Sequence, residues 1–158
     1  MLGITHVIFA FAVGYTLKLP AKIAAAAGLL VDADMIFFLT GPSYPLVHRG
    51  VLHTPLALAL IMILAYFATR RKDVSFAIAA GFISHLLLDT LNPTGIFWLY
   101  PIPMNLSLGL VSYTDIPTNS AIIIFSLALV LVSNPRIFAR LRQMNLPRPR
   151  SKGYKLRL

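Results

Sequence analysis

The residues from Ser75 to Leu91, SFAIAAGFISHLLLDTL, form an apolar run with only two ionisable side chains, His85 and Asp89. The run ends at Asn92-Pro93-Thr94-Gly95, a combination typical of a turn. A helix needs about 20 mostly apolar residues to cross a bilayer, within a range of roughly 17–25. The run therefore predicts a membrane-spanning helix.

Four more apolar runs predict further helices of the same kind, over residues 2–17, 21–40, 54–69 and 118–133. The 158-residue chain is 58% hydrophobic and 12% charged, with a mean hydropathy of +0.78. Soluble domains are nearer 45–50% apolar and about 25% charged. We therefore expect an all-α, polytopic membrane helix bundle of about five transmembrane helices. Several runs are short, so the bundle is thin or some segments are partly re-entrant.

The basic residues predict the orientation of this bundle. With five spans, 13 of the 14 Lys and Arg residues fall on one side and only Arg49 falls on the other. The positive-inside rule then places the N-terminus outside and the C-terminus in the cytoplasm of a multi-pass cell-membrane protein. This predicts a transmembrane domain over residues 1–133 and a basic cytoplasmic tail over residues 134–158.

Two alternatives concern the ends of the chain. The first run resembles a cleaved signal peptide in length, but its charges, Lys18 and Lys22, follow the apolar stretch instead of preceding it. The basic tail contains Arg136, Arg140, Arg142, Arg148, Arg150, Lys152, Lys155 and Arg157. Such a tail binds nucleic acid in some proteins, but beside a membrane span it is expected to contact anionic lipid head groups.

The rare acidic and imidazole side chains converge on the outer side of this topology. They are His6, Asp32, Asp34, His48, His53, His85, Asp89 and Asp115. Only Asp73 falls elsewhere, next to Arg70-Arg71-Lys72, where a solvated charge is expected. Isolated ionisable groups in a membrane are costly, and a shared cation reduces this cost. A single His or Asp could also simply hydrogen-bond to a neighbouring helix.

The spacing of these residues favours a metal site. His85 and Asp89 are four residues apart and share a helical face. Asp32 and Asp34 are two apart, so either the helix is distorted there or one of them only orients a ligand. Seven nitrogen and oxygen ligands exceed the four of one zinc ion, so two ions are expected: zinc, with manganese, iron or nickel as alternatives.

Several motifs resemble the YdjM-like family of prokaryotic inner-membrane proteins, described as membrane-bound metal-dependent hydrolases. The motifs are Thr5-His6, Asp32-Ala33-Asp34, the His-Arg-Gly-x-x-His-Thr run from His48 to Thr54, and Ser84-His85-Leu86-Leu87-Leu88-Asp89. The resemblance implies that the metal ligands are His6, Asp32, Asp34, His48, His53, His85 and Asp89. One departure is that Val31 occupies the position before Asp32 where proline is expected.

With such ligands, we expect a metal-activated water to hydrolyse a phosphoester near the extracytoplasmic face, such as that of a phospholipid. The chain has no Glu, so the expected general base is Asp34 or Asp89. Arg49 is expected to bind phosphate and stabilise the transition state, or instead to pair with Asp32 or Asp115 or to anchor at head groups. Asp115 is expected to cap the last helix, with a role as a further ligand as the alternative.

Two other functions use the same residues. In the first, the protein is a structural or regulatory membrane protein, and the sole role of the metal is to hold the helices together. A metal or proton transporter is less favoured, because it needs a polar path to both sides and the cytoplasmic halves of the runs are apolar. Phe97, Trp98, Tyr100 and Tyr113 are interpreted as an interfacial aromatic belt.

Overall fold

The computed structural model describes residues 1–40, 48–112 and 114–144, and their regular structure is helical. The elements are α1 (Gly3–Thr16), α2 (Ala21–Leu30), the 3-10 helices η1 (Val31–Thr40) and η2 (Val51–His53), α3 (Pro55–Thr69), α4 (Lys72–Thr90), α5 (Ile116–Ser133) and α6 (Pro135–Met144). No strand forms within the described ranges, where a single bridge joins Ile96 and Leu106. The all-helical prediction is confirmed.

All five predicted apolar runs coincide with helices, but within the described ranges two of these are long and apolar enough to cross a membrane. These two are α4 and α5, whereas α1 and α3 are shorter apolar helices. The predicted run 21–40 is divided, because α2 ends at Leu30 and continues as η1.

Some predictions concern residues outside the described part of the chain. They are the aromatic role of Tyr113 and the lipid contacts of Arg148, Arg150, Lys152, Lys155 and Arg157.

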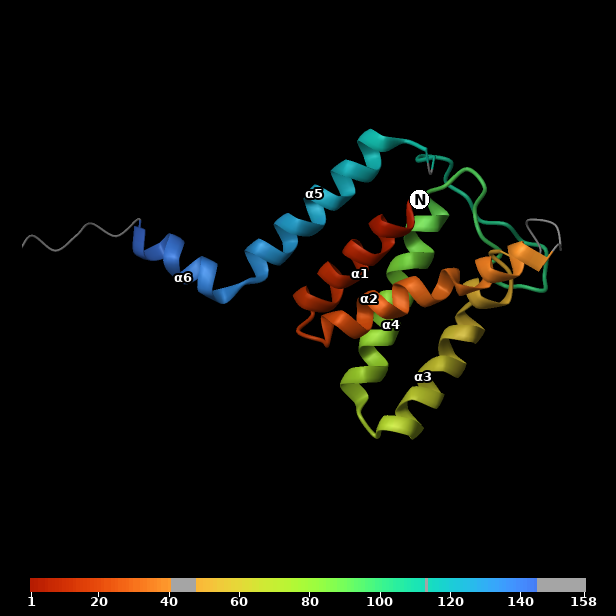
Figure 1. Ribbon diagram of the computed structural model, residues 1–158, viewed down its shortest axis with the longest axis horizontal. Coiled ribbons are helices and arrows are strands. Elements are labelled where there is room, and N and C mark those ends of the chain that lie inside the picture. The colour runs from red at the N-terminus through yellow and green to blue at the C-terminus, as the bar shows by residue number, and fades with distance from the viewer. Residues whose placement is uncertain (41–47, 113, 145–158) are drawn as a thin grey trace, which may run out of the picture.

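The bundle is built around α1, α2 and α4, which contact one another (Figure 1). Helix α3 packs against α4, and α5 packs along α1 before the chain continues into α6, away from the bundle (Figure 1). Few of the α5 side chains are buried. The buried interior that holds the polar residues therefore lies among α1, α2, α4 and the start of α3.

Small residues bring these helices unusually close. A Cβ atom added to Gly81 of α4 would lie 2.0 Å from the carbonyl oxygen of Ala24 in α2. A Cβ atom on Gly28 would lie 2.8 Å from the Cβ of Ala10 in α1. Small side chains let helix backbones approach closely, which is a common way of packing helices in membranes. This contact sets the position of α4, and of its His85, relative to α2.

The helix starts at Thr54 and Asp115 are capped in different ways. Thr54 precedes α3, its side-chain oxygen accepts a hydrogen bond from the backbone N–H of Ala57 at 3.1 Å, and Pro55 is the first helical residue. Asp115 occupies the N-cap position of α5 but makes no side-chain hydrogen bond to the helix backbone. Its carboxylate accepts a hydrogen bond from the Thr118 hydroxyl instead.

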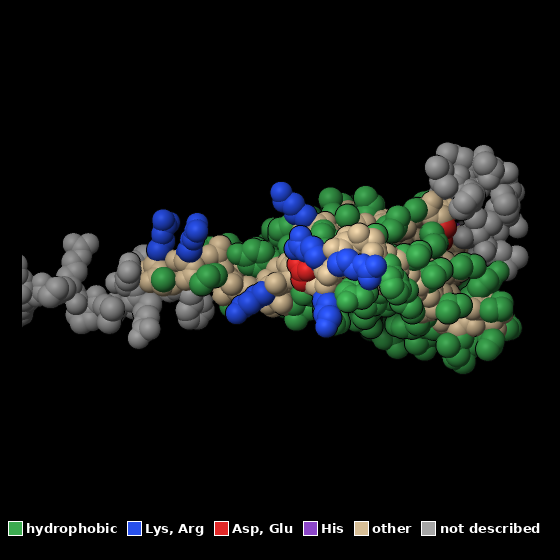
Figure 2. Space-filling model, turned by 90° about the horizontal axis from the view of Figure 1, so that it is seen from below, with side chains coloured by type: hydrophobic (Ala, Val, Ile, Leu, Met, Phe, Trp, Pro, Cys, Tyr) green, Lys and Arg blue, Asp and Glu red, His purple; other side chains and the backbone are tan. Residues whose placement is uncertain are grey.

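Basic side chains gather at one end of the bundle. Figure 2 shows them on the face that carries the turn between α3 and α4, with an apolar surface next to them. In that turn, Arg71 pairs with Asp73 at 2.6 Å and both side chains are exposed. Asp73 is therefore a surface charge, as expected, and lies among basic residues.

Candidate metal centre

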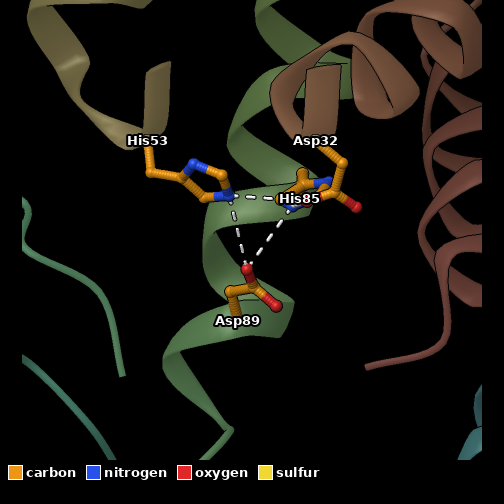
Figure 3. Close-up of side chains that lie close together, drawn as sticks. All are labelled: Asp32, His53, His85 and Asp89. Atoms are coloured by element: carbon orange, nitrogen blue, oxygen red, sulfur yellow. Dashed lines mark ion pairs between the residues drawn. The ribbon is translucent and has the colours of Figure 1, made fainter. Parts of the chain in front are cut away.

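The candidate centre forms where η1, η2 and the last turns of α4 meet. Asp32 comes from η1, His53 comes from η2, and His85 and Asp89 come from α4 (Figure 3). Asp34 also comes from η1. His53, His85 and Asp89 are almost completely buried. Residues more than 30 positions apart in the chain thus share one buried polar site.

Asp32, His53, His85 and Asp89 form the first group, with one ligand atom from each residue within 4.8 Å of the others. The Nε2 atom of His85 lies 3.3 Å from Asp32 and 3.4 Å from Asp89. The Nε2 atom of His53 lies 3.6 Å from each of the same two carboxylates. Figure 3 shows the two imidazoles directed toward the carboxylate of Asp89. These four residues surround one point.

Asp34, His48 and His53 form a second group by the same criterion. The Nδ1 atom of His48 lies 2.8 Å from one oxygen of Asp34, and the Nδ1 atom of His53 lies 3.2 Å from the other. His53 therefore directs Nε2 to the first group and Nδ1 to the second. Among the described residues, it is the one member that the two groups share.

The 3-10 geometry of η1 explains how Asp32 and Asp34 both reach the centre. Positions two apart lie about 160° apart around an α-helix but only about 120° apart around a 3-10 helix. The change of helix type at Val31 therefore turns both carboxylates toward the histidines. The distorted-helix alternative is confirmed, and the distortion occurs without the proline that the motif led us to expect at this position.

A backbone carbonyl orients His85. Its Nδ1 atom lies 2.7 Å from the carbonyl oxygen of Gly28, 57 residues away in α2. Because Nδ1 donates a hydrogen bond to this carbonyl, Nε2 keeps its lone pair free to bind a metal. Metal-ligating histidines usually adopt this arrangement. His6 stacks on His85 with ring centroids 3.9 Å apart, and its Nε2 atom lies 3.3 Å from Asp89. His6 thus contacts the centre but belongs to neither group.

Arg49 is buried beside the centre, held by the loop that follows α4. Its guanidinium donates hydrogen bonds to the hydroxyl of Thr94 and, at 2.6 Å, to the carbonyl oxygen of Gly95. Another guanidinium nitrogen lies 3.6 Å from Asp89. The guanidinium therefore pairs with Asp89 instead of the expected Asp32 or Asp115.

The family model of the YdjM inner membrane protein family matches residues 1–145 of the chain. The chain belongs to the YdjM inner membrane protein family. Neither the comparison with curated proteins nor the comparison with solved structures finds a match. The family description supplies a membrane location but no reaction, so the chemistry of this YdjM member rests on its own side chains.

The chemistry of the centre suits a divalent cation. Within the described part of the chain, both ring nitrogens of His53 and Nε2 of His85 are buried without a hydrogen bond of good geometry. Buried polar atoms normally have partners, so such orphaned atoms indicate a missing ligand. Burial lowers the pKa of His53, but the carboxylates of Asp32 and Asp34 outweigh that effect and hold its pKa above the ordinary value. The carboxylate field that attracts a proton also attracts a metal ion.

The structure brings six of the seven ligands implied by the sequence motifs into the two groups of this YdjM centre, and it places His6 and Arg49 beside them. Asp115 lies outside both groups, at the start of α5. Sequence reasoning missed Gly28, Thr94 and Gly95, which hold His85 and Arg49. Two of these act through backbone oxygens, which every residue carries, so the sequence offered no signal for them. Trp98 donates a hydrogen bond to Thr90 at 3.1 Å and packs against the buried apolar cluster.

Proposed function

We propose that this YdjM family member is a membrane-embedded, metal-dependent hydrolase that acts on a phosphoester, such as that of a phospholipid. The observation that carries the proposal is the contact of a buried His/Asp centre with a cavity. Asp32, His48, Arg49 and Asp89 line a cavity of about 510 Å³. A purely structural centre needs no such access.

The two residue groups differ in the number of metal coordination positions that they leave open. Four protein ligands complete the coordination of a structural zinc ion, whereas a catalytic zinc site has three and keeps a position for water or substrate. The first group supplies four side chains and the second supplies three. Both groups reach the cavity, the first through Asp32 and Asp89 and the second through His48, so the number of ligands is what distinguishes them. We assign a structural role to the first group and a catalytic role to the second.

The side chains then have separate roles. Cations bound at the centre would supply Lewis-acid chemistry and lower the pKa of water; zinc is our first choice, and manganese, iron and nickel fit the same ligands. Asp34 faces His48 with one carboxylate oxygen and His53 with the other, so one oxygen can bind a cation while the other acts as a general base. Arg49 carries a positive charge that faces the cavity, where its guanidinium can bind a phosphate oxygen.

The activity test uses detergent-purified protein, stripped of metal and reloaded with zinc or manganese. We expect phosphate-ester hydrolysis of phospholipid or aryl phosphate that requires metal. Arg49→Lys retains the charge but loses the planar fork, so kcat/KM falls by about 10²–10³, the usual effect of losing one transition-state donor.

The matched control is Arg71→Lys, which should keep wild-type activity. Arg71 lies in the exposed turn between α3 and α4, at the opposite end of α4 from His85 and Asp89. Metal-loaded wild-type protein without hydrolysis of either substrate would refute the hydrolase. A purely structural or regulatory metal centre would then be the better description.

We also propose five membrane spans, with the centre near the outer face and the α3–α4 turn in the cytoplasm. The grouping of basic residues at that turn supports this orientation (Figure 2). The chain has no cysteine, so single cysteines can report the sidedness of exposed positions. We expect Met104→Cys to react with a membrane-impermeant maleimide in intact cells, and Arg71→Cys only after lysis. The reverse pattern would overturn the orientation.

A further inference from the structure

An apolar groove on the outside of the bundle lies next to the cavity at the centre. The groove has a volume of about 510 Å³ and runs along α2 and the start of η1. Gly3, Asp32 and Met35 line both spaces, so the cavity and the groove meet at these residues. These three residues therefore separate the cavity at the His/Asp centre from the outer surface of α2.

The groove lies on an apolar outer surface of α2, the kind of surface that faces lipid in a membrane protein. Leu29 and Leu30 line the groove and are 56% and 48% exposed. Asp32 is the only charged residue among the described residues that line the groove. The polar cavity contains the charged groups instead, with the Arg49 guanidinium beside Asp89. An apolar groove next to a cavity that holds a guanidinium and the candidate metal ligands is complementary to a lipid whose phosphate can bind the guanidinium and a cation.

From this adjacency we propose that a membrane phospholipid enters the centre sideways, past Gly3 and Met35, with an acyl chain in the α2 groove and its phosphate in the cavity. This inference rests on the proposed function and specifies its substrate class as a lipid phosphoester. An acyl chain gains little by moving from bilayer to groove, because both are apolar. The phosphate contacts therefore supply the affinity, while the groove lets the chain remain in apolar surroundings.

Gly3 is the residue that tests the path. It is the first residue of α1, and a Cβ atom added there would meet no atom within 4 Å. A larger side chain is thus accommodated without displacing the helix, but it fills the junction between cavity and groove. Replacing glycine in a helix with leucine also favours the helix. Gly3→Leu should block the path without unfolding the protein.

The experiment uses metal-loaded full-length protein in nanodiscs that contain phosphatidylglycerol with a photoreactive group on one acyl chain. We expect crosslinks at Leu29, Leu30 and Met35 in the wild type. In Gly3→Leu their yield falls by about tenfold, the scale of discrimination in a hydrophobic pocket. Metal content and melting temperature stay at wild-type values, and the ratio of lipid to aryl phosphate turnover falls. Gly3→Ala gives an intermediate yield, and Leu60→Phe, on the exposed face of α3, gives the wild-type yield.

The outcomes separate the two proposals. Crosslinks spread evenly over all apolar surfaces, or a groove yield that Gly3→Leu leaves unchanged, would overturn lateral entry. The expected crosslinks without hydrolysis of any phosphoester would support the groove as a lipid site and refute the hydrolase. Hydrolysis of phospholipid that is equal in the wild type and in Gly3→Leu would support the hydrolase and refute the path.

Discussion

His53→Ala is expected to weaken metal binding in both groups, from about two ions per chain to fewer than one. The physical reason is that His53 directs Nε2 to Asp32 and Asp89 and Nδ1 to Asp34. Its loss leaves the first group with three ligands and the second with two. Elemental mass spectrometry of the purified protein, with circular dichroism as a check of helix content, measures the effect.

Two further variants make this prediction specific. His48→Ala removes a ligand of the second group only, so about one ion should remain. His6→Ala removes an imidazole that stacks on His85 but lies outside both groups, and most of the metal should remain. Equal metal loss in His6→Ala and His53→Ala would show that the two groups are not the ligand sets.

Gly81→Ala is expected to destabilise the bundle more than the same change at Gly28 or Gly3. The new Cβ atom would lie 2.0 Å from a backbone carbonyl oxygen of α2, and backbone cannot move aside as the end of a side chain can. Overpacking of this kind typically costs about 1–3 kcal/mol, and occasionally more. Because α4 would shift away from α2, the contact between His85 and the Gly28 carbonyl should lengthen, and metal affinity should fall as well.

A series of three alanine variants measures this effect by thermal unfolding in detergent. Gly28→Ala, which would meet the Ala10 side chain at 2.8 Å, should lower the melting temperature less than Gly81→Ala. Gly3→Ala meets nothing within 4 Å and should leave it unchanged. A Gly81→Ala protein with the melting temperature and metal content of the wild type would contradict the close crossing of α2 and α4.

The candidate site could be predicted from the sequence as a set of residues but not as an arrangement. Sparse His and Asp residues in an apolar chain stand out because burying each of them alone is costly. How these residues divide into two ligand groups depends on the orientations of the imidazole rings and on the angles and distances at which the helices cross. For this reason the sharing of His53, the exclusion of His6 from both groups and the pairing of Arg49 with Asp89 could not be predicted.

The sequence by itself determined the helices, because apolar runs and their Pro, Asn and Gly boundaries act locally. It also determined which side chains could bind metal, because so few ionisable residues occur in the runs. Only the tertiary structure decided that α2 becomes a 3-10 helix at Val31 and that Gly28 orients His85. It alone decided that a groove meets the polar cavity at Gly3. These features arise where residues distant in the chain touch, and that contact depends on how closely small residues let the helices approach.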